Sequence, residues 1–252
     1  MENELTEKVE QLRAELTKIG IRPLVDQPEY LIKFLRARSS DVTSTVTLMK
    51  SYLDYKGANP NIFNLPYRLK PVFDANVMRL LDTRSKVGEA LVLFKPGYWN
   101  PSSFNFDGLL SAALITFEQA ALDSETQKAG VLLISDMDSF GWKQLKHFGP
   151  MAAKKLATVL EKVVPTRVNG VMIFNQSRIA EMAWAVIRPF LSEHLRSRVT
   201  FHGSDYQYLE QTIQDPTLLP ATLGGQVALL ECSDLYRNLA NNENLYKSFG
   251  YN

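Results

Sequence analysis

The sequence has few of the residues from which common catalytic and metal sites are built. Cys232 is its one cysteine, which excludes an intrachain disulfide and a cysteine-rich metal site and is typical of a reducing compartment. The histidines at 147, 194 and 202 lack the spacing of metal ligands. The chain contains no G-x-G, no G-x-x-x-x-G-K-[ST] and no G-x-S-x-G. We therefore expect neither a nucleotide-binding loop nor the nucleophile elbow of a hydrolase.

Long apolar runs and a strong net charge are also missing. No run of about 18 apolar residues occurs, which predicts that no segment spans a membrane. The N-terminal stretch shows neither the apolar core nor the cleavage site of a signal peptide. The formal net charge of +1 argues against a general nucleic-acid binder. With 45% hydrophobic and 22% charged residues, the chain of 252 residues has the composition of a soluble globular protein, and we expect it in the cytoplasm.

Candidate catalytic groups are sparse. Asp136 and Asp138 end a predicted strand and could form a carboxylate pair, but acids at such a place more often cap the next turn or meet a nearby arginine. His202 ends another predicted strand, where a satisfied polar group is a commoner role than a metal ligand. We therefore expect no catalytic residue, no cofactor and no bound metal.

The basic residues are concentrated in one stretch. Between Lys143 and Thr200 the sequence has ten lysines and arginines but three acidic residues. Such an excess is common in a solvated face without a partner. The alternative is a surface for anionic lipid or phosphate. Residues 163–177 raise this question most directly, because Arg167 stands in the turn that leads into a predicted buried strand.

Helical and strand patterns divide the chain near residue 75. Residues 1–75 carry helical spacing and helix-capping residues. Residues 76–82 and 89–96 are short apolar runs joined by a turn, which predicts a hairpin. Predicted strands then alternate with predicted helices, which indicates an α/β layer with parallel pairing. These strands are expected within 130–138, 170–176 and 198–204, and the helices within 104–123, 149–164 and 179–197.

Three of the predicted helices each have an apolar face. Ordinary core packing accounts for each face singly. The last segment differs, because it follows a strand, is interrupted at Pro189 and is rich in bulky apolar groups. Such a helix at the rim of a sheet is suited to act as a lid over an apolar cavity. The face residues are Leu110, Ala113, Leu114 and Phe117; Leu156, Val159, Leu160 and Val163; and Ile179, Met182, Ala183, Val186, Ile187 and Phe190, with Trp184 alongside.

Five stretches stand in the order found in a known family. Residues 30–42, 130–138, 167–176, 188–205 and 218–225 resemble the CRAL-TRIO lipid-transfer family. The resemblance is strongest to its branch of α-tocopherol transfer protein, cellular retinaldehyde-binding protein and the clavesins. It covers about residues 28–226, and its most specific parts are P-F-L-S-E-H-L-R-S-R-V-T-F-H-G-S and L-P-A-T-L-G-G in combination.

The resemblance implies an N-terminal helical domain over residues 1–75, a lipid-binding domain over 76–226 and a C-terminal tail over 227–252. It implies a small helical bundle followed by a mixed, mostly parallel five-stranded sheet, with helices that enclose an apolar cavity under a mobile gate helix at about Ile179–Leu191. The implied cavity wall contains Leu110, Ala113, Phe117, Val131, Leu133, Ser135, Leu156, Val159, Leu160, Val171 and Ile173. The implied gate residues are Ile179, Met182, Ala183, Trp184, Val186, Ile187, Phe190 and Leu191.

The resemblance also gives a role to Arg167. In the tocopherol relative, basic groups at the matching turn and after the gate contact phosphoinositide head groups. Arg38, Arg167 and Arg198 keep three of these positions, and Arg196 is a further basic residue nearby. The mouth of the cavity would then face an anionic membrane, and arginine suits phosphate because it binds in a bidentate manner.

Four positions depart from that relative. Thr47 and Asn169 stand where it is basic, so its complete phosphoinositide clamp is not reproduced here. Ala113 and Phe117 replace small hydroxyl residues on the cavity helix. These two changes imply a drier and narrower cavity than one built for tocopherol.

Together these features predict a monomeric, non-enzymatic protein that binds one hydrophobic lipid and transfers it between membranes. Its gate would open at an anionic, phosphoinositide-containing surface, with which the protein would associate transiently. The expected ligand is a retinoid, tocopherol, carotenoid, another isoprenoid or a phospholipid. The alternative is a lipid-sensing scaffold that recruits a protein partner without moving lipid, for which the acidic segment from Glu2 to Leu16 is a candidate surface. The tail receives no predicted role.

Overall fold

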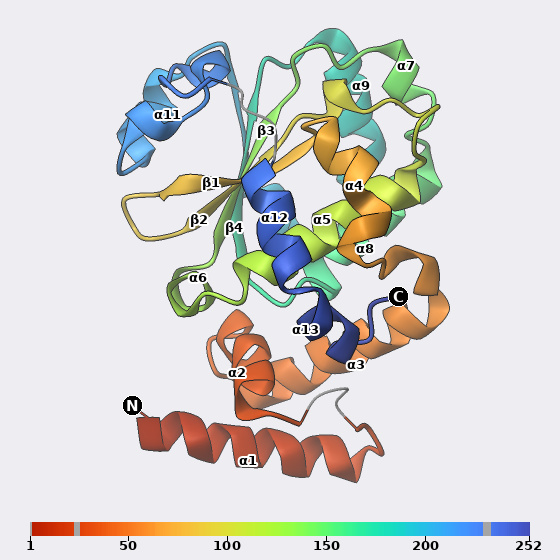
Figure 1. The fold of residues 1–252 in the computed structure, drawn as a ribbon, viewed down its shortest axis with the longest axis vertical. Helices are drawn as coiled ribbons and strands as arrows, with labels where there is room; N and C mark the ends of the chain where they lie inside the picture. Colours follow the sequence, from red (N-terminus) through yellow and green to blue (C-terminus); the bar gives the residue numbers. More distant parts are fainter. Residues whose placement is uncertain (1, 23–25, 229–232) are drawn as a thin grey trace.

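The centre of the protein is a five-stranded sheet (Figure 1). The computed structural model describes residues 2–22, 26–228 and 233–252. The strands lie in the order β1-β2-β3-β4-β5, with β1 antiparallel to β2 and all other pairs parallel. This confirms the predicted mixed, mostly parallel sheet. The strands are β1 (Met78–Arg84), β2 (Ala90–Phe94), β3 (Val131–Asp136), β4 (Val168–Phe174) and β5 (Val199–Gly203).

The predicted hairpin is formed by β1 and β2. Their register runs from Met78 opposite Phe94 to Arg84 opposite Ala90. Gly88 in the turn has a φ of 91°, a backbone conformation that a side chain would strain. The hairpin forms one edge of the sheet, and each later strand is added in parallel through a helical crossover, as the alternating pattern predicts.

The two faces of the sheet are covered by different segments. Along β3, Leu133 and Ser135 point to one face, while Leu132 and Ile134 point to the other, as strand alternation requires. The first face is covered by α5 (Phe106–Ala120), α8 (Pro150–Lys162) and α9 (Arg178–Ile187). The second face is covered by α11 (Gln207–Thr212), η4 (Pro216–Leu218) and η5 (Ala221–Leu223). The short connecting helices are η2 (Pro96–Tyr98), α6 (Ser124–Ala129), α7 (Trp142–Leu145), η3 (Arg188–Phe190) and α10 (Glu193–Arg196).

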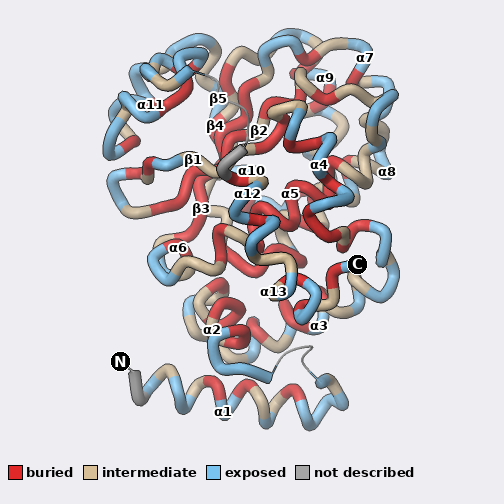
Figure 2. Tube along the Cα trace, in the orientation of Figure 1, coloured by how far each residue is buried: buried red, intermediate tan, exposed pale blue. Residues whose placement is uncertain are grey.

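The N-terminal region is helical, as predicted. Asp41 caps α3 by accepting a hydrogen bond from the Ser44 amide at 2.8 Å. The apolar face of α1, with Val9, Leu12 and Leu16, is buried in the main core, and its other residues are mostly exposed (Figure 2). The segment from Glu2 to Leu16, the candidate surface for a protein partner, is therefore part of a helix that packs on its own domain. The helices are α1 (Glu2–Lys18), α2 (Pro28–Ala37), α3 (Val42–Ala58), η1 (Pro60–Ile62) and α4 (Pro66–Asp74).

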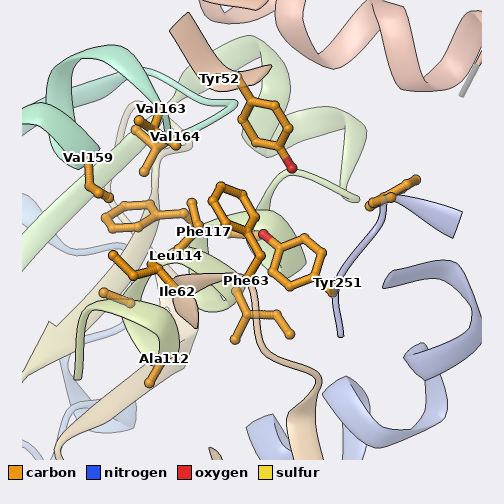
Figure 3. Close-up of a cluster of buried hydrophobic side chains, with 14 of the residues drawn as sticks. Tyr52, Ile62, Phe63, Ala112, Leu114, Phe117, Val159, Val163, Val164 and Tyr251 are labelled. Carbon is orange, nitrogen blue, oxygen red and sulfur yellow. The ribbon is translucent and has the colours of Figure 1, made fainter. Parts of the chain in front are cut away.

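The C-terminal tail is part of the core. It contains α12 (Ser233–Asn241) and α13 (Glu243–Ser248), which lie beside the N-terminal helices (Figure 1). Tyr251 packs against Phe63 with ring centroids 5.4 Å apart (Figure 3). The Asn252 amide donates to the carbonyl of Phe63, and the Asn252 carbonyl accepts from the amide of Leu65. The tail therefore ties the helical region to the α/β body, a role that the sequence did not reveal.

Lys56 contacts the C-terminal tail, and its lowered pKa makes the free energy of unfolding of the protein depend on pH in the alkaline range. Its ammonium donates to the backbone carbonyl of Phe249 and lies 5.1 Å from the ring centroid of Phe63. Burial lowers the pKa of Lys56 to about 8. The pKa of an unfolded lysine is about 10.4. Between the folded-state pKa and this value, the unfolded state therefore binds more protons than the folded state. The contribution of Lys56 to the free energy of unfolding therefore rises with pH across this interval.

Replacing Lys56 with methionine is expected to remove this rise. Urea denaturation at about pH 7.5 and about pH 9.5 gives the pH dependence of the unfolding free energy for both proteins. Other titrating groups are shared, so the difference between the two slopes isolates Lys56. Equal slopes for the wild type and Lys56→Met would show that the Lys56 pKa is not lowered.

Candidate functional site

An apolar cavity lies between the sheet and the helices on its first face. Its volume is about 160 Å³, which is below the ~300–1,000 Å³ typical of ligand pockets. Strands β1 to β5 form its floor, and α5, α8 and α9 form its walls. Among the described residues that line it, no side chain is charged.

Nine of the eleven predicted wall residues line this cavity. These are Leu110, Ala113, Phe117, Leu133, Ser135, Leu156, Leu160, Val171 and Ile173. Val131 and Val159 do not line it. Val131 lies at the start of β3, and Val159 faces a buried cluster with Val163 and Val164 (Figure 3), so both contribute to the main core instead.

Other wall residues were not identified from the sequence. Helical faces located the lining residues of α8 and those of α5 except Phe106 and Leu109, but several aromatic groups come from loops and strand ends that carry no periodic signal. Phe94 could have been found, because it is two residues after the buried Val92 and so lies on the same face of β2. The missed residues are Met78, Phe94, Pro96, Trp99, Phe106, Leu109, Met137, Phe140, Phe148, Ala180, Leu195, Val199 and Phe201.

The predicted gate segment is α9 followed by a single 3-10 turn. The break predicted at Pro189 is the start of this turn, η3. Ala183, Trp184, Ile187 and Leu191 line the cavity. The other predicted gate residues do not: Ile179 packs beside Phe140, Val186 is partly exposed, and Met182 and Phe190 are exposed.

Helix α9 is held by two small apolar clusters rather than by the main core. Near its start, Ala180 and Ala183 pack against Phe140. Beyond its end, Leu191 and Leu195 pack against Ala157 of α8. Its first turn is capped by Ser177, and the Ser192 amide after it donates to Glu161 Oε1 at 2.7 Å. Trp184 and Ile187 of α9 also pack against the second cluster, so α9 lies on these two small clusters and outside the main core.

The outer surface around α9 carries large exposed apolar side chains. Met182 of α9 and Phe190 of η3 are 46% and 38% exposed. Trp142 of the neighbouring α7 is 62% exposed, and Met151 of the neighbouring α8 is 79% exposed. All four side chains therefore lie on α9 itself or on elements next to it in the chain or in space.

Two of the four predicted phosphoinositide residues bind the α2–α3 loop to the body. Arg38 donates to the carbonyl of Glu161, near the C-terminus of α8, at 3.0 Å, and burial lowers its pKa. Arg167 donates to Ser39 Oγ at 3.1 Å and to the carbonyl of Lys128. Both guanidinium groups therefore lie where this loop meets the turn that enters β4.

The other two basic residues lie at the neighbouring strand entry. Arg196 is exposed in α10, and Arg198 directly precedes β5. Since β4 and β5 are parallel, Arg167 and Arg198 stand at the same edge of the sheet. We call this edge, with Arg38, Arg167, Arg196 and Arg198, the basic edge.

Thr47 and Asn169, which stand at two positions where the resemblance leads one to expect a basic residue, make hydrogen bonds within the protein. Thr47 donates to the carbonyl of Thr43 within its own helix, at 3.2 Å. Asn169 donates at 2.7 Å to Glu89 and to the carbonyl of Ala129, and so fixes the entry of β4. Neither side chain adds a positive charge to the basic edge.

The remaining sequence candidates are engaged in structural contacts. Asp136 is fully buried, pairs with Lys95 and accepts from the amide of Asp138 at 3.1 Å. His202 stacks between Phe174 and Tyr208. Over residues 2–22, 26–228 and 233–252, the structure contains no group of three histidine, cysteine or acidic residues placed to hold a metal, and no helix of the length and hydropathy needed to cross a membrane.

Comparison with known proteins places these features in context. The chain is 30% identical over 204 residues to the alpha-tocopherol transfer protein-like protein of Homo sapiens, which covers 80% of this chain and 59% of that protein. It is 28% identical over 245 residues to clavesin-1 of Xenopus laevis, covering 94% and 74% of the two chains. The chain therefore spans less than two thirds of the length of the first of these relatives.

The fold has a counterpart among solved structures. The crystal structure of Sfh5 matches with a TM-score of 0.56 at 14% identity, over 86% of this chain and 81% of that one. The model of the CRAL/TRIO domain matches residues 76–225, more than half of the sequence. The chain belongs to the CRAL/TRIO domain family.

Proposed function

We propose that this protein binds one hydrophobic lipid in the cavity and transfers it between membranes, without catalysing a reaction. The observation that carries the proposal is an uncharged, almost wholly apolar cavity under a helix that packs on two small apolar clusters outside the main core. Similarity to a protein named for alpha-tocopherol transfer supports the same function. Burial of a lipid in such a cavity is favourable by about 25 cal/mol for each Å² of apolar surface removed from water.

Helix α9 is the proposed gate. Opening it in water would expose Trp184, Ile187 and the rest of the cavity wall, which is unfavourable. At a bilayer the same groups meet hydrocarbon, so the cost of opening falls there. The exposed Met182, Phe190, Trp142 and Met151 are suited to enter the bilayer interface first.

The basic edge is the proposed contact for anionic head groups. Arg167 and Arg198 lie beside the end of the segment that carries the gate, and each basic residue near an anionic surface contributes about 1 kcal/mol. Arg38 and Arg167 already donate hydrogen bonds within the protein. Phosphate binding by these two would therefore add to or replace contacts with the α2–α3 loop.

Reversal of two charges at the basic edge tests the docking step. Arg167→Glu together with Arg198→Glu is expected to slow lipid transfer to phosphoinositide-containing vesicles by at least about tenfold, from the loss of about 2 kcal/mol of attraction. Transfer to neutral vesicles and loading of lipid should be unchanged. The rate is measured from the movement of a fluorescent lipid between donor and acceptor vesicles at low and high salt, because salt screens the attraction.

The matched control reverses the same number of charges on exposed helices. Lys18 on α1 and Lys247 on α13 are 68% and 52% exposed and form only short-range helical ion pairs. Lys18→Glu with Lys247→Glu should leave transfer to anionic vesicles nearly unchanged. An equal loss in both double variants would attribute the effect to net charge and refute the basic edge as a docking site.

A further inference from the structure

Among the described residues that line the cavity, Ser135 alone carries a hydroxyl group. The other N–H or O–H donors among the described lining side chains are the indoles of Trp99 and Trp184, and Trp99 already donates to the carbonyl of Phe104 at 2.9 Å. No lining side chain among the described residues is charged. Ser135 is therefore the one polar group that a fixed wall, rather than the gate helix, offers to a ligand.

The hydroxyl of Ser135 lacks a strong partner. Its residue is 6% exposed, and its Oγ donates to Met137 Sδ at 3.4 Å. A thioether is a weak acceptor. A buried hydroxyl with so weak a contact is unfavourable unless something else accepts its proton. The side chain that bears it points into the cavity, so the missing acceptor would have to be an atom of the ligand.

The position of Ser135 sets where the oxygen of a ligand would lie. It lies near the carboxyl end of β3, opposite Phe94 on β2 and Ile173 on β4, which both line the cavity. Towards the amino ends of the strands, the wall is formed by Leu160, Val199 and other apolar groups. Beyond the carboxyl ends of the strands the wall is apolar as well, with Met137 and Phe140, so an oxygen held by Ser135 would lie between two apolar parts of the cavity.

We infer that Ser135 is the polar anchor of the cavity, which selects a neutral lipid with one hydroxyl or carbonyl oxygen over a pure hydrocarbon and over a lipid with a charged head group. This rests on the proposed binding function. Ser135 donates to the oxygen of the ligand. A phosphate group would meet no counter-charge on this wall and would be excluded from the cavity.

Competition between matched probes tests the anchor. Vesicles that contain equal amounts of tetradecane, 1-tetradecanol and tetradecyl phosphate are incubated with the protein, and the bound probes are extracted and quantified by mass spectrometry. The ratio of bound alcohol to bound hydrocarbon is expected to fall about three- to tenfold in Ser135→Ala, as loss of one hydrogen bond implies. Ser135→Thr keeps the hydroxyl and should keep the ratio, and the phosphate should stay unbound in all variants. Comparing the same ratio in two proteins cancels the different partitioning of the probes between water and vesicle.

Two further variants distinguish Ser135 from the neighbouring polar groups. Ser111→Ala removes an equally buried hydroxyl of α5 that contacts Asn64 outside the cavity, and should leave the ratio unchanged. Trp184→Phe removes the other available donor. An unchanged ratio in Ser135→Ala, or a fall in Trp184→Phe alone, would overturn the role of Ser135 while leaving lipid binding intact. Failure of the wild type to take up any probe would refute the cavity function and the anchor with it.

Discussion

Replacing Glu118 with alanine is expected to lower the free energy of unfolding by about 3–5 kcal/mol. Glu118 is 0% exposed and its carboxylate lies 2.6 Å from the ammonium of Lys33, which is 2% exposed. Burial lowers the pKa of Lys33, and the charge of Glu118 opposes this shift. Without Glu118, the ammonium would remain among the rings of Tyr30 and Phe249 without its carboxylate partner, and Tyr52 would lose its acceptor.

The pair matters for function because it joins three parts of the chain. Lys33 lies on α2, Glu118 on α5 and the Phe249 ring, 4.0 Å from Lys33 Nζ, in the tail. Phe117, next to Glu118, forms part of the cavity wall. Loss of the pair therefore loosens the helix from which that wall is built.

Urea denaturation measures this prediction against two controls. Lys33→Met with Glu118→Leu removes both charges and should recover most of the stability lost in Glu118→Ala. Asp54→Ala breaks the exposed pair with Lys50, where the side chains are 65% and 58% exposed, and should cost below about 0.5 kcal/mol. A loss below about 1 kcal/mol in Glu118→Ala, or a double variant as unstable as the single one, would contradict a dominant cost of the unpaired charge.

Filling the cavity is expected to abolish lipid uptake without unfolding the protein. Ala113 lies on α5 with its side chain in the cavity wall, so Ala113→Phe places a ring in existing space. Each 60 Å² or so of ligand surface that the ring keeps in water costs about 1.5 kcal/mol of binding, or about tenfold in affinity. Uptake of a fluorescent lipid from vesicles measures the loss, and thermal unfolding shows whether the fold is retained.

The opposite change provides the matched comparison. Phe117→Ala enlarges the same cavity from the same helix and should widen the range of ring-bearing lipids that are taken up, at a cost in stability of up to about 3–5 kcal/mol. If Ala113→Phe takes up lipid as the wild type does while remaining folded, the ligand does not occupy this cavity. A surface site would then have to be sought instead.

The sheet and about half of the residues that line the cavity could be predicted, mainly because their signals are local. The hairpin follows from two apolar runs and a glycine turn, and the inward residues of α5 and α8 follow from helical spacing. The resemblance places Val131 and Val159 in the wall, but both side chains are buried in the main core and do not line the cavity. Which part of an apolar face borders a cavity depends on packing at a distance, and periodicity carries no information about it.

The contacts that could not be predicted join distant parts of the chain. Lys33 and Glu118 are 85 residues apart, and nothing local distinguishes a lysine on α2 from a solvated one. The sequence also gave no sign of the role of the tail, because Tyr246 and Tyr251 are buried through contacts with residues that are distant in the chain. The hydrogen bonds from Arg38 and Arg167 to the α2–α3 loop are of the same kind.

Native mass spectrometry of the purified protein, followed by organic extraction, tests the central claim most directly. The account predicts one neutral lipid for each chain in the native spectrum, lost from the protein and recovered in the extract. The absence of any bound species, together with no uptake from a lipid mixture, would contradict a lipid-binding cavity. The exposed apolar surface around Met182 and Phe190 would then have to serve a protein partner.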